Sequence, residues 1–534
     1  MRITNRMITG NTKSNINSNK LLVDKYNTQM TTRKKISKAS ENPVIAIRAL
    51  RLSTTMSHIN QYIDNNIPDA SAWMDVTETA LNNMEALLDD IRSQCVYGST
   101  DTLNEGDRET ILEALKSLSE QVYAEGNADY AGKTVFTGYR SSKNLTFDKQ
   151  ELDTKYEIDQ SFDFSNLEEK RYYTGTVVVP EAVTDNTQPC DTQVLEHVYE
   201  RVRLAYNGDT QVNEFSYQYQ DEDGATVQIK ATRNEDGAYE VKAYDVAEDG
   251  TLTERDSLPE GMTEPTVTAY ETETAWEQAK GTKTVSDNEI IYIEETGEFI
   301  FGKDIANNIA DKKCTLDINY TKTGFDKGEV RPEYYYDCRD ISDDDPSKHV
   351  TYTKQDQPIN YEIASNTTIT INTQADKVFD TAIARDVDEL INIVQKAITA
   401  NNKVKEIEEM MQEAQYSDDK SQEMLQGYLD AAKKEADYAD HNLQKTYEQY
   451  ITRFDGYMEK VNTAITNVGS TKNSLNLTKN RVENQQMTIE ELQSDNEDRD
   501  ISEIIIDYYA AYNAYTSSLT AAGKLGETSL LNYI

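Results

Sequence analysis

Apolar residues recur at alternating three- and four-residue intervals along two long stretches of this chain, one near each end. A repeat averaging about 3.5 residues places a narrow apolar stripe along a helix, and a partner helix must cover that stripe. The sequence therefore predicts that long helices from the two ends pack together. The stripes consist of Ala49, Leu52, Met56, Ile59, Ile63, Ala70, Trp73, Ala80, Met84, Leu87 and Ile91 in the first stretch, and of Val461, Ile465, Val468, Leu475, Val482 and Ile489 in the second.

The middle of the chain has a different character. Seven of the nine prolines lie between Pro180 and Pro358, where they would interrupt any long helix. Apolar and polar residues alternate in 215–219 and 227–231, and Asp-Gly turn sequences follow each run, which is typical of β-hairpins. We expect an α+β multi-domain chain with a helical part at residues 1–140, a β-rich insertion at 141–375 and a second helical part at 376–534.

Local signals predict where individual elements begin and end. Asn42 can cap a helix that begins at Pro43, because the missing proline N–H does no harm there. Pro68 lies inside the first apolar stripe, so we expect a kink or a short break. Four helices are expected before residue 140, and a further hairpin over 290–301. After helix returns near Ile383, breaks are expected near Ser417 and Gly469.

Composition excludes several classes of partner. The net charge is −41, which repels nucleic acid and anionic membrane surfaces, so we expect neither as a partner. No apolar run approaches the roughly 20 residues that a membrane span requires. Only 37% of the residues are hydrophobic, which suits helical rods and a modest β domain better than a thick globular core.

No catalytic, cofactor or metal site can be identified from the sequence. The four histidines lie far apart, and the four cysteines lack metal-ligand spacing. Phosphate loops, dinucleotide fingerprints and nucleophile elbows are absent from the sequence, and the acidic clusters do not follow calcium-loop spacing. The expected catalytic, cofactor and metal residues are therefore none. The pattern favours a protein that assembles over an enzyme.

Several short motifs occur in a fixed order near the two ends: Met1–Met7, Ile36–Val44, Arg48–Leu50, Tyr130–Gly138, Ile359–Thr373, Arg499–Glu503 and Ser529–Ile534. Together they resemble the motifs of flagellar hook-associated proteins of type 3, the junction proteins of the flagellin family. One of them departs slightly, because Glu41 and Asn42 stand where the family usually has two aspartates before the proline. The resemblance covers roughly residues 1–140 and 360–534 and leaves most of 141–358 unexplained.

The resemblance implies a flagellin-like structural protein of the bacterial flagellum. Such a protein would be transiently cytoplasmic, would bind an export chaperone, and would leave through the flagellar type III export apparatus to the extracellular hook–filament junction. There it would self-associate into a ring between flagellin and the neighbouring hook-associated junction protein. The terminal helices would line the axial tube and the β-rich insertion would face outward. Two alternatives remain, a divergent flagellin that forms the filament itself, and a surface adhesin or enzyme carried by the middle domain.

The extreme terminal helices are the predicted assembly interface. A pair of helices this thin leaves apolar surface uncovered, so neighbouring subunits would bury it. The predicted interface residues are Ile16, Val23, Tyr26 and Met30 in the first helix and Ile501, Ile505, Tyr508, Tyr512, Tyr515 and Leu519 in the last.

Overall fold

A computed structural model describes residues 5–100, 105–184, 187–190, 192–220, 225–247, 249–255 and 265–527. The terminal motif residues 1–4 and 529–534, and the turn at 221–224, lie outside this range. Before residue 140, the described residues form the four expected α-helices. They are α1 (Asn5–Thr32), α2 (Pro43–Gln61), α3 (Ile67–Gly98) and α4 (Glu105–Glu125).

The predicted helix start at Pro43 is confirmed. The Asn42 side chain accepts hydrogen bonds from the backbone N–H groups of Val44 and Ile45, at 3.1 and 3.4 Å. Of the kink or short break expected at Pro68, the break is absent. Instead a π-helical turn, η1 (Tyr62–Asn66), joins α2 to α3, and the Ile67 N–H donates to the Tyr62 carbonyl. This wider turn relieves the clash of the proline ring with the preceding turn, so the chain stays helical.

The middle of the chain forms two main sheets. One has the strand order β10-β11-β12-β5-β4, and the other has the order β15-β14-β3-β13-β6-β7-β8-β9. Phe215 of β6 stacks on Phe299 of β12 at 5.2 Å between ring centroids, so the two sheets share a core. Their strands are β3 (Glu151–Asp163), β4 (Glu168–Thr174), β5 (Leu195–Arg203), β6 (Thr210–Gln220), β7 (Thr226–Arg233), β8 (Tyr239–Val246), β9 (Leu252–Glu254), β10 (Thr266–Tyr270), β11 (Glu289–Ile293), β12 (Glu298–Phe301), β13 (Thr315–Phe325), β14 (Asp337–Asp340) and β15 (Val350–Tyr352).

The hairpins predicted from alternating residues are confirmed. In β6 and β7, Tyr217 pairs with Ile229 in antiparallel register. In β11 and β12, Ile291 pairs with Ile300. Smaller elements complete the middle: the hairpins β1 (Asp129–Tyr130)–β2 (Lys133–Thr134) and β16 (Asn360–Ala364)–β17 (Thr367–Thr370), and the short helices α5 (Glu273–Lys280) and α6 (Lys303–Asp311).

Three long helices follow: α7 (Ala382–Gln412), α8 (Asp419–Glu497) and α9 (Ile501–Glu527). The break near Ser417 is confirmed, since the 3₁₀ turn η7 (Ala414–Tyr416) separates α7 from α8. The break predicted near Gly469 is wrong, because α8 runs through it without interruption. One glycine costs a helix only about 1 kcal/mol, and packed residues on either side, such as Val468 and Leu475, outweigh that cost. The helix ends instead at residues 498–500.

The chain divides into two compact units. Unit 1 contains residues 1–72, 360–370 and 470–534, and unit 2 contains residues 73–359 and 371–469. These bounds differ from the division at 140 and 375, which stays a prediction. The expected multi-domain α+β class is confirmed.

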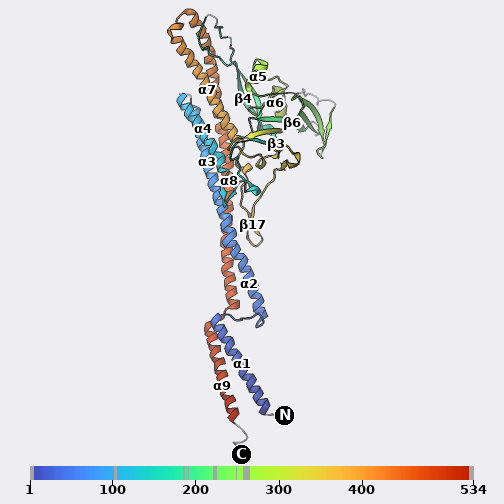
Figure 1. The fold of residues 1–534 in the computed structure, drawn as a ribbon, viewed down its shortest axis with the longest axis vertical. Helices are drawn as coiled ribbons and strands as arrows, with labels where there is room; N and C mark the ends of the chain where they lie inside the picture. The colour runs from blue at the N-terminus through green and yellow to red at the C-terminus, as the bar shows by residue number, and fades with distance from the viewer. Residues whose placement is uncertain are drawn as a thin grey trace, which may run out of the picture. The chain divides into compact units, whose positions relative to one another are not determined.

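Within unit 1, α2 lies beside the last part of α8 (Figure 1). The Gln486 side chain donates to Asn60 at 2.9 Å, and the Asn496 side chain donates to the Ile45 carbonyl at 3.1 Å. The two helices therefore run antiparallel, and the stripe residues Ile59 and Val482 are buried together. Helices from distant parts of the sequence pair here as the heptad stripes predict.

Candidate assembly surface

Helices α1 and α9 lie side by side in unit 1 (Figure 1). The Asn19 side chain donates to the Ala514 carbonyl at 3.3 Å, which fixes their contact midway along both helices. On α9, Ile504 is fully buried and Ala511 is 7% exposed. On α1, the four predicted residues Ile16, Val23, Tyr26 and Met30 are all half-buried. These residues mark the seam between the helices.

The six predicted residues of α9 differ in exposure. Tyr508 and Tyr515 are half-buried on the side that includes Ile504 and Ala511. The other four residues are exposed: Ile501, Ile505, Tyr512 and Leu519. The sequence analysis missed Ile504 and Ala511 because 504–506 is an unbroken run of isoleucine, which allows more than one register. The seven-residue spacing of Ile504 and Ala511, with Tyr508 and Tyr515 at the intervening seam positions, was the available signal.

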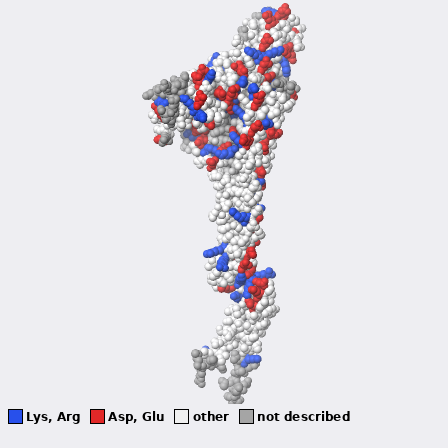
Figure 2. Space-filling view, turned by 180° about the vertical axis from the view of Figure 1, so that it is seen from behind, with Lys and Arg blue, Asp and Glu red and all other residues white. Residues whose placement is uncertain are grey.

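Large apolar side chains of both helices therefore remain exposed. Besides the four exposed predicted residues, Ile506 is 67% exposed and Tyr509 is 60% exposed. On α1, Leu21 and Leu22 are also exposed. In the view of Figure 2, the surface of these two helices carries few charged side chains. Contiguous apolar surface of this kind on a helix is typical of an interaction site.

Arg499 connects the seam to the end of α8. Its guanidinium donates to the Gln29 side-chain oxygen at 3.0 Å, pairs with Asp507, and lies 5.6 Å from the centre of the Tyr26 ring. Its backbone N–H donates to the Arg33 carbonyl at 2.9 Å. Nearby, Lys34 pairs with Asp498 at 2.7 Å. Figure 2 shows this gathering of opposite charges where α8 gives way to α9. The contacts hold the α8–α9 connection against the end of α1.

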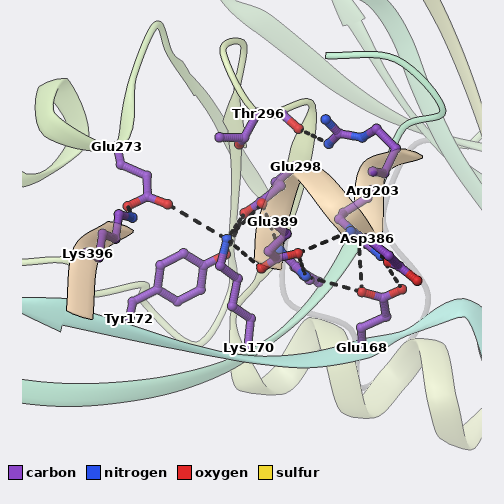
Figure 3. A network of polar contacts seen from close by, with 12 residues as sticks. Glu168, Lys170, Tyr172, Arg203, Glu273, Thr296, Glu298, Asp386, Glu389 and Lys396 are labelled. Carbon is purple, nitrogen blue, oxygen red and sulfur yellow. Dashed lines mark hydrogen bonds and ion pairs between the residues drawn. The ribbon is translucent and has the colours of Figure 1, made fainter. Parts of the chain in front are cut away.

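Unit 2 contains a buried network of ion pairs (Figure 3). Asp386 of α7 is fully buried and pairs with Arg203 of β5 and, at 2.8 Å, with Arg453 of α8. The Tyr457 hydroxyl also donates to Asp386, at 2.8 Å. Sheet and helices are thus joined through one carboxylate.

A second carboxylate repeats this arrangement one turn further along α7. Glu389 accepts from Arg201 and, at 2.7 Å, from the Tyr450 hydroxyl. Lys170 lies 3.3 Å from Glu389 and 2.8 Å from Glu298. Every charge named here faces an opposite charge, although Arg201 Nε and Arg203 Nε are buried without a hydrogen-bond partner among the described residues. The network joins β4, β5 and β12 to α7 and α8.

The network shifts the pKa of its carboxyl groups. Burial of Glu168 acts to raise its pKa, but Arg203, Arg201 and Arg453 outweigh burial and lower it to about 2. Glu389 is also desolvated, yet Arg201, Lys170 and Arg203 hold its pKa well below the usual range. Both groups are therefore ionised in the folded protein at neutral pH.

We expect acid to destabilise unit 2 through Glu168. The pKa of Glu168 falls from 4.5 to about 2 on folding, so its contribution is complete above pH 4.5 and is lost as the pH falls through 2. That contribution is on the order of 3 kcal/mol. Urea unfolding at a series of pH values, followed by tryptophan fluorescence, measures it. Glu168→Gln should reduce the change in the free energy of unfolding between pH 4.5 and pH 2. An unchanged pH dependence of that free energy would contradict the assignment.

The described residues contain no helix long and apolar enough to cross a membrane. Three of the four cysteines, Cys95, Cys314 and Cys338, are buried free thiols, and Cys190 is half-buried and also free. Burial raises the pKa of Cys95 to about 12, so this thiol is unreactive.

The N-terminal region matches a known sequence family. Residues 3–141 match the bacterial flagellin N-terminal helical region. Flagellar hook-associated protein 3 of Escherichia coli is 25% identical over 142 residues, which cover 26% of this chain and 44% of that protein. The protein of the same name from Salmonella typhimurium gives the same figures. The matched stretch is thus less than half the length of these relatives. The resemblance to hook-associated protein 3 inferred from the short motifs is confirmed.

Some solved structures align with this chain at low similarity. One is a putative flagellar hook-associated protein from Vibrio parahaemolyticus, with 11% identity and a TM-score of 0.35, covering 86% of this chain and all of that one. Another is the flagellar junction protein FlgL from Legionella pneumophila, with 11% identity and a TM-score of 0.27, covering 80% of this chain and 99% of that one.

Proposed function

We propose that this chain is a structural protein of the bacterial flagellum, which forms a ring at the junction between hook and filament. The observation that carries the proposal is the uncovered apolar surface of α9, formed by residues such as Ile506 and Tyr509 beside a seam with α1. The similarity of residues 3–141 to the flagellin N-terminal region gives this surface its context. Covering an exposed apolar helix face by neighbouring subunits lowers the free energy, which favours assembly.

In this proposal the paired helices of the two ends form the assembling rod, and the β-rich insertion at residues 141–375 faces outward. The ten predicted residues of α1 and α9 have two roles in this proposal. The half-buried ones hold the two helices together, and Ile501, Ile505, Tyr512 and Leu519, which are exposed, meet neighbouring subunits. The role is structural and requires no catalytic group.

The proposed partners follow from this position. Copies of the chain contact one another in the ring, the neighbouring hook-associated junction protein binds one side, and flagellin binds the other. Before assembly the chain binds an export chaperone and passes through the flagellar type III export apparatus to the cell exterior. The uncovered α9 surface is suited to the chaperone as well, because it needs a partner until assembly.

Labelling of isolated flagella tests the proposal. An antibody against residues 141–375 should give one band where the hook meets the filament, because a ring occupies a single position. Labelling along the whole filament would instead identify a divergent flagellin. Flagella without label would contradict both assignments and direct attention to binding or catalysis by the middle domain. An antibody against flagellin, applied to the same preparation, controls for access to the filament.

A further inference from the structure

The outward face of α2 is apolar and basic. Val44, Ile47 and Leu50 are 60%, 52% and 69% exposed, and they lie on the side of the helix away from α8. Arg48 and Arg51 lie among them, one turn from Val44 and Ile47. Neither arginine forms an ion pair with any residue that the structure describes, and α2 contains no acidic residue. This face therefore presents two unpaired cations around an apolar row.

The outward face of α8 in unit 1 has the opposite charge. Met487 is 58% exposed, and Glu483, Glu490 and Glu491 lie three or four residues from it, on the neighbouring turns of the helix. Within the described part of the chain, Glu490 and Glu491 have no cationic partner, and Glu483 has only a long contact of 3.9 Å with Lys479. This face presents an apolar centre with an acidic border.

The two faces point to different sides of the helix pair and are offset along it. The buried sides of α2 and α8 face each other through Ile59 and Val482, so the exposed sides point in opposite directions. Because Asn496 contacts Ile45 and Gln486 contacts Asn60, Met487 lies nearer to the level of Asn60 than to the level of Val44. At a rise of about 1.5 Å per residue, each patch is roughly 10 Å long. Neither face can reach the other within one chain.

We infer that the basic face of α2 docks onto the acidic face of α8 in a second copy of this chain. The contact is heterologous, with different surfaces on the two partners, and such contacts close into rings when the rotation between copies permits. Opposite charges fix the register, and contact between the apolar row of α2 and Met487 excludes water. This inference rests on the proposed ring and names the surfaces that form it. It predicts that every subunit uses one basic and one acidic face.

Cross-linking in flagella tests the contact. The full chain carries Leu50→Cys and Met487→Cys, with Cys190→Ser to remove the one native thiol that is not buried. Flagella are isolated from cells that make this variant, treated with a short bismaleimide and analysed by denaturing electrophoresis with the antibody. A head-to-tail contact gives a ladder of multiples of the chain. Leu50→Cys alone should give only monomer, because residue 50 faces residue 487 of its neighbour.

Charge reversal provides the matched control. Arg48→Glu with Arg51→Glu should lower the ladder yield about tenfold, equivalent to about 1.4 kcal/mol. Glu490→Arg with Glu491→Arg should do the same, and all four substitutions together should restore the yield.

The remaining outcomes overturn the inference in distinguishable ways. A dimer from Leu50→Cys alone would indicate a symmetric contact, and one product of a different mass would indicate another protein on this face. Absence of the ladder, although the chain is present at the junction, would overturn the inference and leave the proposed function intact. Absence of the chain from flagella would overturn both.

Discussion

Replacement of Asp386 by alanine should destabilise unit 2 by about 3–5 kcal/mol. Asp386 is fully buried and accepts hydrogen bonds from Arg203, Arg453 and the Tyr457 hydroxyl. Its removal therefore leaves two guanidinium groups with less negative charge beside them, in a site shielded from water. Glu168 still contacts both arginines, which keeps the loss within this range. Urea unfolding followed by tryptophan fluorescence measures the effect, because Trp73 and Trp276 both lie in unit 2 and are buried.

Glu406→Ala is the control for this substitution. Glu406 also lies on α7, but it is exposed and distant in sequence from the network. Removal of an exposed carboxylate changes stability by no more than about 0.5 kcal/mol. Equal effects of the two substitutions would show that the network contributes little beyond ordinary helix surface.

Ile504→Ala should separate α1 from α9. Ile504 is the one fully buried isoleucine of α9, and its truncation removes apolar contact that a two-helix seam cannot replace by repacking. We expect a loss of about 2 kcal/mol or more in the opening free energy of both helices. Hydrogen exchange of the backbone amides in residues 5–32 and 501–527 measures this loss directly.

Ile506→Ala is the matched comparison, with the same chemical change two residues away. Because Ile506 is 67% exposed, its truncation should leave the exchange of α1 and α9 in the free chain unchanged. If the exposed surface meets neighbouring subunits, this variant should still lower the amount of chain retained at the junction. Equal protection losses in the two variants would contradict the assignment of inner and outer faces. Full retention of Ile506→Ala would argue against the outer face as an assembly contact.

Features set by neighbouring residues were predictable from the sequence. Asn42 and Pro43 define a helix start because a side-chain oxygen and a missing N–H act on the next few residues alone. The hairpins at 215–231 and 290–301 follow from residue alternation and short turns. The heptad stripes, in the same way, determined which residues of α2 and α8 are buried against each other.

Features that depend on distant residues were decided only by the tertiary structure. The run at 504–506 is apolar in every register, so only packing against α1 determined that Ile504 is inside and Ile506 outside. Gly469 did not end α8, because packing outweighs the small helix cost of one glycine. The network around Asp386 joins residues from β5, α7 and α8, more than 180 positions apart for Arg203, and no local pattern reports an ion pair formed by folding. The sequence alone determined the helices and hairpins, because these depend on interactions between residues close together in the chain. The assembly surfaces were decided only by the tertiary structure, because folding determines which helix faces are left uncovered.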